Sequence, residues 1–128
     1  MRLIRRTLLL ALCAVLMATG LALAGEPQIP KPGTVTLLDL GSECIPCELQ
    51  DRIVHRVAPE FGDKVAVVYL DVEKNPQYKA QYKIDIIPTL IFYDTKGNEV
   101  QRVSGYMKEG SMRKLLRELT GVPGAGAQ

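Results

Sequence analysis

The feature that most constrains the fold is a change of hydrophobic period around two closely spaced cysteines. Residues 35–40 form a β-rich and mostly apolar run that predicts a buried strand. Residues 41–43 interrupt this run, and Cys44 and Cys47 follow. From about Pro46 onward, apolar residues recur at helical spacing. The cysteine pair therefore lies where a strand passes into a helix.

The predicted helix has one apolar and one polar face, and Pro59 marks its end. Leu49, Ile53 and Val57 recur every four residues and are expected to face the core. Gln50 falls among the charged residues of the opposite face. This spacing predicts an amphipathic helix that covers a sheet.

The rest of the chain continues the alternation of strands and helices. We expect a strand at 65–72, a short helix at 76–82, a hairpin of strands at 88–93 and 99–104, and a last helix at 109–119. The first two strands should be parallel, with a right-handed crossover. Little alternation along 65–72 predicts a strand covered on both faces. The fold class is an α/β three-layer α/β/α sandwich, whose mixed sheet has a parallel core and an antiparallel hairpin.

Residues 1–24 are typical of an export signal. Three arginines in the first six residues precede an apolar run from Leu8 to Leu23, and an Ala-Leu-Ala sequence predicts cleavage before Gly25. The alternative is an uncleaved membrane anchor over 7–24. Either form places the protein in the periplasm or outside the cell.

The remaining 104 residues suit one domain. We expect a proline-rich linker at 25–33, the folded domain at 34–120 and a flexible Gly/Ala tail at 121–128. The full chain has 16 basic and 14 acidic residues, but the predicted signal holds three of the basic ones, so the mature net charge is −1. Such a charge argues against a nucleic-acid partner.

The cysteine pair has the spacing of a redox dithiol. A disulfide between Cys44 and Cys47 would close a very short loop and add little stability. Unpaired N–H groups at a helix start would stabilise a Cys44 thiolate, and Pro46 is well tolerated in a first helical turn. Cys44 is therefore the expected attacking sulfur and Cys47 the resolving one. An inert disulfide or a metal site are alternatives, although His55 is the only histidine and is expected to be solvated.

In several blocks the chain resembles the thioredoxin family, over about residues 33–120. The matching segments are Cys44-Ile45-Pro46-Cys47, Asp71-Val72-Glu73-Lys74-Asn75-Pro76, Ile86-Ile87-Pro88-Thr89, and Gly97-Asn98-Glu99 with Gly105.

This resemblance implies a cis peptide bond before Pro88, which would expose the backbone of Ile87 to an extended substrate segment. It also implies that Ile45, Pro46 and Gly105 contribute to substrate binding. The implied partners are protein disulfides or dithiols and an upstream electron donor, which could be membrane-bound. A monomer without a cofactor is expected.

Three features depart from the family pattern, and the third involves a pair of residues. Glu43 stands where a tryptophan usually precedes the first cysteine, and Glu48 where a lysine often follows the second. Leu38 and Tyr69 occupy the positions of a buried aspartate and its lysine partner, while Asp39 lies one residue later. Asp39 is either a displaced proton acceptor for Cys47 or a solvated edge charge.

The acidic neighbours bear on the direction of the reaction. The negative charges of Glu43 and Glu48 disfavour a thiolate beside them, and this makes the dithiol form less stable relative to the disulfide. A less stable dithiol form lowers the reduction potential, so we expect a reductant instead of a strong oxidant. The alternative function is a copper or other soft-metal carrier that uses the same two cysteines. Such sites usually recruit Met or His, and Met107 and Met112 lie in the last helical region with no clear pairing to the cysteines.

Overall fold

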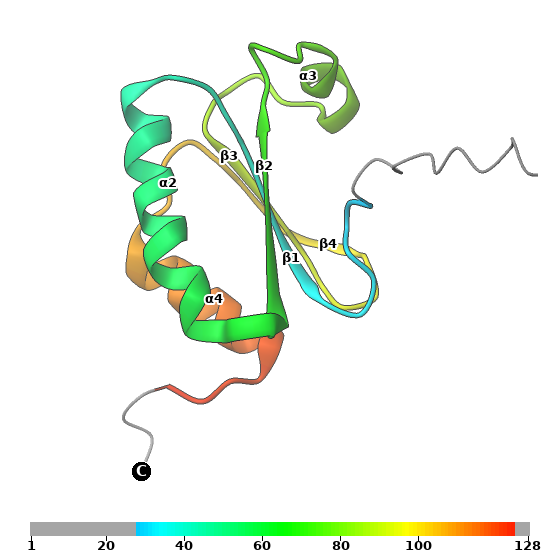
Figure 1. The fold of residues 1–128 in the computed structure, drawn as a ribbon, viewed down its shortest axis with the longest axis vertical. Coiled ribbons are helices and arrows are strands. Elements are labelled where there is room, and N and C mark those ends of the chain that lie inside the picture. Colours follow the sequence, from blue (N-terminus) through cyan, green and yellow to red (C-terminus); the bar gives the residue numbers. More distant parts are fainter. Residues whose placement is uncertain (1–27, 125–128) are drawn as a thin grey trace, which may run out of the picture.

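The structure is a computed structural model that describes residues 28–124. The predicted signal, the first residues of the predicted linker and the last four residues of the tail lie outside the described part. The elements are β1 (Val35–Gly41), α2 (Ile45–Val57), the 3₁₀ segment η2 (Ala58–Lys64), β2 (Val65–Asp71), α3 (Gln77–Tyr82), β3 (Thr89–Tyr93), β4 (Glu99–Ser104) and α4 (Glu109–Thr120) (Figure 1). Within residues 28–124, no helix has the length and apolar character needed to cross a bilayer.

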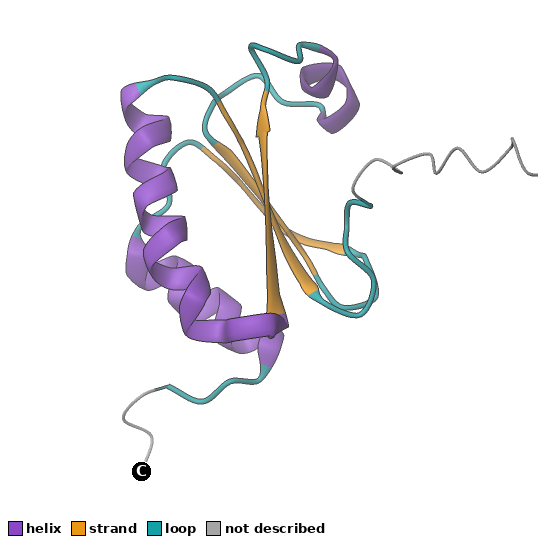
Figure 2. Cartoon of the chain, viewed as in Figure 1, coloured by secondary structure: helices purple, strands orange, loops and turns teal. Residues whose placement is uncertain are grey.

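A four-stranded mixed sheet forms the centre of the molecule, in the order β2-β1-β3-β4 (Figure 2). β1 and β2 are parallel, and Val35 lies opposite Val65. β3 is antiparallel to both β1 and β4. The predicted fold class, with its parallel core and antiparallel hairpin, is confirmed.

β2 corrects one prediction. Its sequence predicted a strand covered on both faces, but among the described residues β2 is an edge strand paired only with β1. Val67 and Tyr69 remain 40% and 47% exposed. A run of β-branched residues cannot distinguish a central strand from an edge, because that depends on which strands pair with it.

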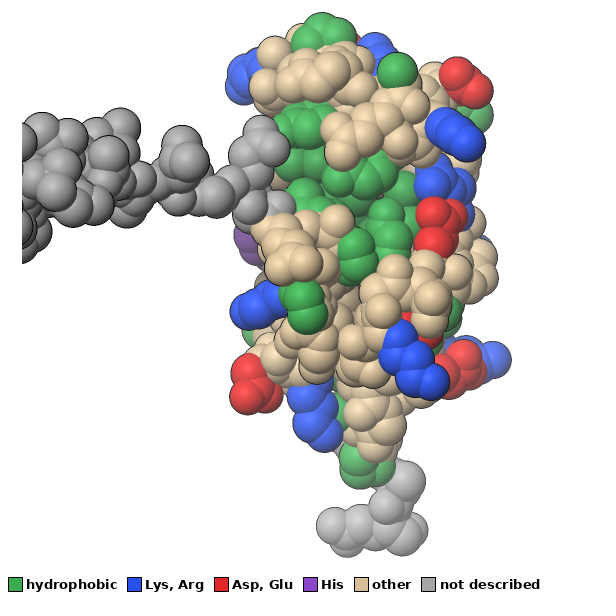
Figure 3. Space-filling view, turned by 90° about the vertical axis from the view of Figure 1, so that its right-hand side faces the viewer, with side chains coloured by type: hydrophobic (Ala, Val, Ile, Leu, Met, Phe, Trp, Pro, Cys, Tyr) green, Lys and Arg blue, Asp and Glu red, His purple; other side chains and the backbone are tan. Residues whose placement is uncertain are grey.

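Helices α2 and α4 pack on one face of the sheet, where they enclose the larger core (Figure 1). Leu37 and Leu90 reach this core from the sheet, and Met112 and Leu116 reach it from α4. The short α3 lies against the opposite face, which carries a second cluster around Leu38. Hydrophobic side chains remain visible on that face between the polar ones (Figure 3).

The buried face of α2 differs from the predicted one. Ile53 and Val57 are buried as expected, but Leu49 is 48% exposed and Gln50 is completely buried. A four-residue repeat drifts around a helix with 3.6 residues per turn, so Leu49 rotates away from the sheet. The side chain of Gln50 takes the inward position in its place.

The described part of the predicted linker is attached to the domain. The Gly33 N–H donates to the Thr95 carbonyl at 3.1 Å, and the Lys31 N–H donates to Thr36 Oγ1 at 2.9 Å. Ile29 packs against the second cluster. Residues 29–33 therefore continue the fold along the β3–β4 hairpin.

Candidate functional site

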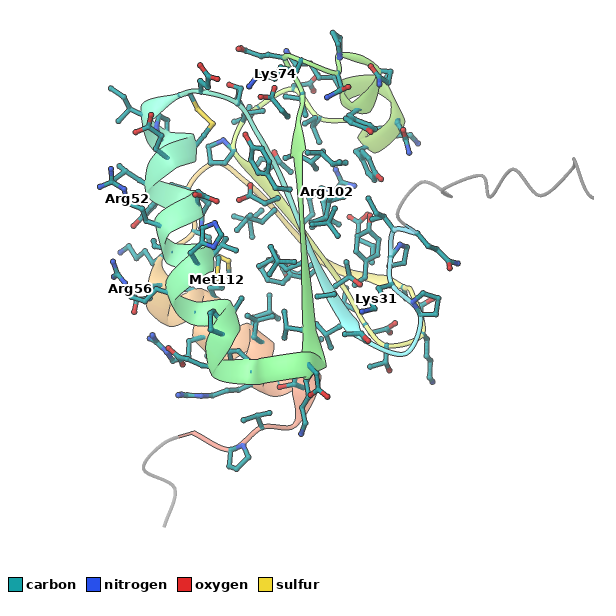
Figure 4. The ribbon with its side chains drawn as sticks, viewed as in Figure 1. Lys31, Arg52, Arg56, Lys74, Arg102 and Met112 are labelled. Atoms are coloured by element: carbon teal, nitrogen blue, oxygen red, sulfur yellow. A yellow bond between two sulfur atoms is a disulfide. The ribbon has the colours of Figure 1, made fainter. Side chains whose placement is uncertain are left out.

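The two cysteines form a disulfide at the start of α2, with Cα atoms 5.1 Å apart (Figure 4). Cys44 is the N-cap residue in an extended conformation, and its Sγ accepts the Cys47 N–H at 3.2 Å. Pro46 lies in the first turn, where its missing N–H is no loss. Cys44 is partly exposed, whereas Cys47 is only 5% exposed. One sulfur thus meets solvent while the other is shielded.

Gly41 allows α2 to approach the end of β1 closely. A Cβ at this position would lie 3.6 Å from Cys47 Sγ and 3.4 Å from the Tyr69 ring. Because side chains alternate along a strand, Asp39 projects from β1 on the same side as Gly41. The sheet therefore presents Asp39 to the helix that carries Cys47.

Asp39 is buried, at 2% exposure, which rejects its interpretation as a solvated edge charge. It lies opposite Tyr69 in the β1–β2 register and opposite Leu90 in the β1–β3 register. Burial, and secondarily the charge of Asp51, raise the pKa of this carboxyl to about 7, although His55 lowers it. A group with that pKa can accept and release a proton near neutral pH.

The Pro88 turn lies beside the end of β1 that leads to the cysteines. Leu40 pairs with Thr89, so Pro88 lies next to the point where β1 passes into the cysteine segment. The peptide bond between Ile87 and Pro88 is cis. The Gly105 N–H donates to the Pro88 carbonyl at 2.7 Å, which links Gly105 to this turn.

Apolar side chains are exposed around this end of the molecule. Ile45, directly after Cys44, is 77% exposed, and Pro46 is exposed as well. Ile86 before the cis bond and Tyr106 after Gly105 are also more than half exposed. Of the predicted substrate-binding residues, Ile45 and Pro46 are thus accessible beside the disulfide, whereas Ile87 and Gly105 are partly exposed.

Sequence reasoning missed Gln50. Its Oε1 accepts the Met107 N–H at 2.7 Å in the interior, which ties α2 to the segment after Gly105. Its Nε2 is buried without a hydrogen-bond partner among the described residues. The four-residue spacing predicts that Gln50 lies on the solvated face of the helix. Only the drift of that spacing against 3.6 residues per turn indicates its burial.

Sequence reasoning also missed Lys74. Its Nζ lies 3.0 Å from Glu43 Oε1 and 3.4 Å from Asp71 Oδ2, so Glu43 beside the disulfide has a cationic partner (Figure 4). These contacts raise the pKa of Lys74, chiefly through Glu43. Of the two acidic neighbours of the cysteines, Glu48 has no ion pair within residues 28–124.

A cleft of about 370 Å³ opens beside Cys47, between α2 and β2. Asp51, His55 and Tyr69 line it together with Cys47. His55 Nε2 lies 3.2 Å from Asp51 Oδ1, and the histidine side chain is 76% exposed. His55 is thus solvated, as expected, but it also forms part of the wall beside the resolving cysteine.

The two methionines of the last helical region lie in the core, away from any role as exposed soft-metal ligands. Met112 is completely buried and Met107 is 9% exposed, both packed in the larger cluster. Within the described residues, no group of three or more His, Cys, Asp or Glu side chains is arranged to hold a metal ion.

Comparison with known proteins gives one consistent family. The model of the family described as Thioredoxin matches residues 28–118. A thioredoxin of Staphylococcus aureus is 30% identical over 73 residues, which cover 57% of this chain and 69% of the relative. Among solved structures, a mutant thioredoxin from Halobacterium salinarum is 26% identical with a TM-score of 0.62, covering 72% of this chain and 80% of its own. Chloroplastic thioredoxin z has a TM-score of 0.64 at 24% identity, covering 70% and 81%.

Proposed function

We propose that this chain, which belongs to the thioredoxin family, reduces disulfides of exported proteins through its Cys44–Cys47 pair. Family and disulfide together make it a thiol–disulfide oxidoreductase. The observation that carries the proposal is the unequal exposure of two bonded sulfurs at a helix start. An exposed sulfur can be reached by a substrate, while its shielded neighbour is held for the second step.

The reaction follows from this arrangement. In the dithiol form, the Cys44 thiolate attacks a substrate disulfide, forms a mixed disulfide and releases one substrate thiolate. Cys47 then loses its proton and attacks Cys44, which releases the second substrate thiolate and closes the protein disulfide. The substrate gains two electrons and the protein dithiol loses two. Because Cys47 is already adjacent, the second step is intramolecular.

The two cysteines have different neighbours that favour loss of the thiol proton. The helix start and its N–H groups favour a negative Cys44, as the Cys47 N–H already shows by donating to Cys44 Sγ. Asp39 lies on the side of Cys47, where an ionised carboxyl can take the proton of that thiol. This division suits an attacking Cys44 and a resolving Cys47.

The reducing direction rests on the acidic side chains at the site. Lys74 offsets the charge of Glu43, so Glu48 and the carboxyls of the cleft oppose thiolate formation. A dithiol that is little stabilised as thiolate is a better electron donor. Its own electrons would come from an upstream donor in the same compartment.

The substrate is an extended segment of another exported protein. Ile45, Ile86 and Tyr106 offer exposed apolar surface around the disulfide. The cis turn at Pro88 leaves the backbone of Ile87 beside it for main-chain pairing. Export itself rests on the sequence of residues 1–24, and N-terminal sequencing of periplasmic protein that begins at Gly25 would test it.

The central experiment is reduction of insulin with a chemical reductant in excess. The protein should accelerate the reaction, and Cys44→Ser should lower the rate to background. Cys47→Ser should instead accumulate a mixed disulfide with the substrate. Arg52→Gln, an exposed change on the same helix, is the matched control and should react normally. Equal rates with and without Cys44 would overturn the oxidoreductase function.

Equilibration with glutathione tests the direction. We expect a reduction potential more negative than about −200 mV, in the range of reducing members of this chemistry. A potential near about −120 mV, typical of strong periplasmic oxidants, would refute a reductant.

A further inference from the structure

The buried carboxyl of Asp39 needs a route for its proton. Asp39 does not itself line the cleft beside Cys47, but Tyr69, which lies opposite it in the β1–β2 register, does. Asp39 is 2% exposed, so it cannot exchange a proton freely with bulk water. It projects from β1 two residues before Gly41, whose neighbour across the gap is Cys47. Asp39 and Gly41 lie on the same face of β1, about 6.6 Å apart along the strand. Asp39 is therefore placed to receive the Cys47 proton and then must pass it on.

The groups around Asp39 come from the two neighbouring strands, β2 and β3, and from one helix, α2. Leu90 faces it from β3 and carries no proton. Tyr69 faces it from β2, and burial, followed by the nearby carboxylates, raises the pKa of this phenol, which keeps it protonated at neutral pH. From α2, the charged groups that act on Asp39 are Asp51 and His55. Of these groups, only His55 carries a nitrogen that can accept a proton.

The same pair connects the cleft to solvent. Cys47, Asp51 and His55 follow one another at four-residue spacing, so they share one face of α2 and all line the cleft. Exposure rises along this row, from 5% for Cys47 to 45% and 76% for the side chains of Asp51 and His55. The cleft of about 370 Å³ has room for several water molecules at roughly 30 Å³ each. A continuous polar path thus leads from the resolving sulfur outward.

We propose that the Asp51–His55 pair is the proton exit of the resolving step: His55, held by Asp51, carries to solvent the proton that Cys47 gives to Asp39. In the balanced step, the Cys47 thiol transfers a proton to the Asp39 carboxylate and its thiolate attacks Cys44. The substrate leaves as a thiolate. Asp39 then returns its proton through cleft water to neutral imidazole, and the imidazolium releases it to bulk water. This inference rests on the oxidoreductase function proposed above.

The resolving step can be followed by itself with dithiobis-nitrobenzoate, whose reduction releases a coloured thiolate. The reduced protein should release two such anions in two phases, the first from attack by Cys44 and the second from attack by Cys47. Stopped-flow measurement of the second phase against pH reports the proton transfer. If only one anion appears, the oxidoreductase function fails; if both appear, that function stands and the proton exit is tested separately.

The variants His55→Gln and Asp51→Asn should shift this profile in opposite directions. His55 lowers the pKa of Asp39 and Asp51 raises it, so the midpoint of the second phase should move up in His55→Gln and down in Asp51→Asn. His55→Gln should also slow the second phase about 3- to 10-fold at neutral pH, the modest end of acid–base effects. The first phase should keep its wild-type rate in His55→Gln.

Chemical rescue separates proton transfer from structure. Added imidazole should accelerate the second phase of His55→Ala while leaving the wild type unchanged. Arg52→Gln is the control for charge, because Arg52 lies on the same helix but projects away from the sheet (Figure 4). Shifts of both variants in the same direction, profiles identical to the wild type, or equal acceleration of wild type and His55→Ala by imidazole would each overturn the proposal.

Discussion

At the amino end of α2 the chain places a disulfide, a buried carboxyl and a half-paired amide, whereas apolar packing and paired charges predominate at the carboxyl end. Asp39 and Gln50 are both buried near the cysteines, and the Gln50 amide lacks a full set of partners within the described residues. Around η2, Phe61 packs in the core and Arg113 binds two carboxylates. Groups that cost folding free energy lie where the chemistry occurs, and groups that stabilise lie away from it.

We call the carboxyl end of α2 together with η2 the stable end of the molecule. Truncating a core side chain there should have the largest effect on the free energy of unfolding. Phe61 is 4% exposed in the larger core, so Phe61→Ala should lower the free energy of unfolding by about 3–5 kcal/mol. Urea unfolding measures this loss. Leu49→Ala, which truncates a 48% exposed side chain on the redox half of α2, is the control and should cost less than about 1 kcal/mol. Equal losses would show that the two ends do not differ in packing.

Asp39→Asn should raise the free energy of unfolding and slow the resolving step of the reaction. The folded-state pKa of Asp39, about 7, exceeds the ordinary aspartate value of 3.8, so the folded form holds this proton while the unfolded form loses it. Stability therefore falls as pH rises from about 4 to about 7 and stays low above that range. At pH 8 the asparagine variant should be more stable by about 2–4 kcal/mol.

Urea unfolding of the oxidised proteins at several pH values checks this sign. The advantage of Asp39→Asn should grow by about 2–3 kcal/mol between pH 5 and pH 8 and vanish near pH 3. The resolving step of the same variant should be slower. A constant difference across this pH range would mean that the carboxyl does not titrate as its burial requires.

The comparison between the two ends also explains which features the sequence could predict. The order of the elements along the chain and the position of the cysteines followed from local period, because the run 35–40 and the helical spacing after Pro46 each describe a single element. Met112 and Leu116, the buried residues of α4, likewise follow the helical spacing of a single element. Local patterns therefore sufficed for the elements, but not for the edge position of β2.

The details of the redox end, which is the amino end of α2 with its disulfide, depend on contacts between segments that are distant in the sequence. The burial of Asp39 depends on α2 lying over β1, and the pairing of Glu43 with Lys74 joins residues 31 apart. Gln50 accepts from Met107, 57 residues away. No period or motif in the sequence encodes these pairings, so the chemistry of this end required the coordinates.

Gln50→Leu should have a smaller effect on stability and a selective effect on substrate binding. The change removes an unpaired amide but leaves the buried Met107 N–H without its acceptor, so the net loss should be about 1 kcal/mol. The segment that leads from Gly105 to Met107 loses its tie to α2, which should raise the KM for a protein disulfide a few-fold. The rate with dithiobis-nitrobenzoate should not change.

Insulin reduction kinetics and the small disulfide, run side by side, test this selectivity. Gln101→Leu, at an exposed position of β4, is the matched control and should leave both reactions unchanged. If Gln50→Leu slowed both substrates equally, Gln50 would act on the cysteines themselves, and its role in positioning the Gly105 segment would be wrong.

The smallest effect should come from the charges at the stable end. Arg113 donates to Glu60 at 2.8 Å and to Glu109 at 2.7 Å, and Arg56 also binds Glu109 at 2.7 Å. Three ion pairs thus join four side chains in one network, and such a network should stabilise the fold more than an isolated surface pair does. Arg113→Met should lower Tm by about 2–4 °C at low salt, and less at high salt, where ion pairs are screened.

The matched control is Lys114→Met, which removes an 81% exposed cation that lies 4.0 Å from Glu118. It should not change Tm measurably. Arg113 lowers the pKa of both Glu60 and Glu109 by hydrogen bonding, so the difference between Arg113→Met and wild type should disappear as pH falls through their folded pKa values. Calorimetry across salt and pH measures both trends. If the loss in Tm depended on neither salt nor pH, Arg113 would stabilise the protein through packing of its alkyl chain. The stable end would then depend on apolar contacts alone.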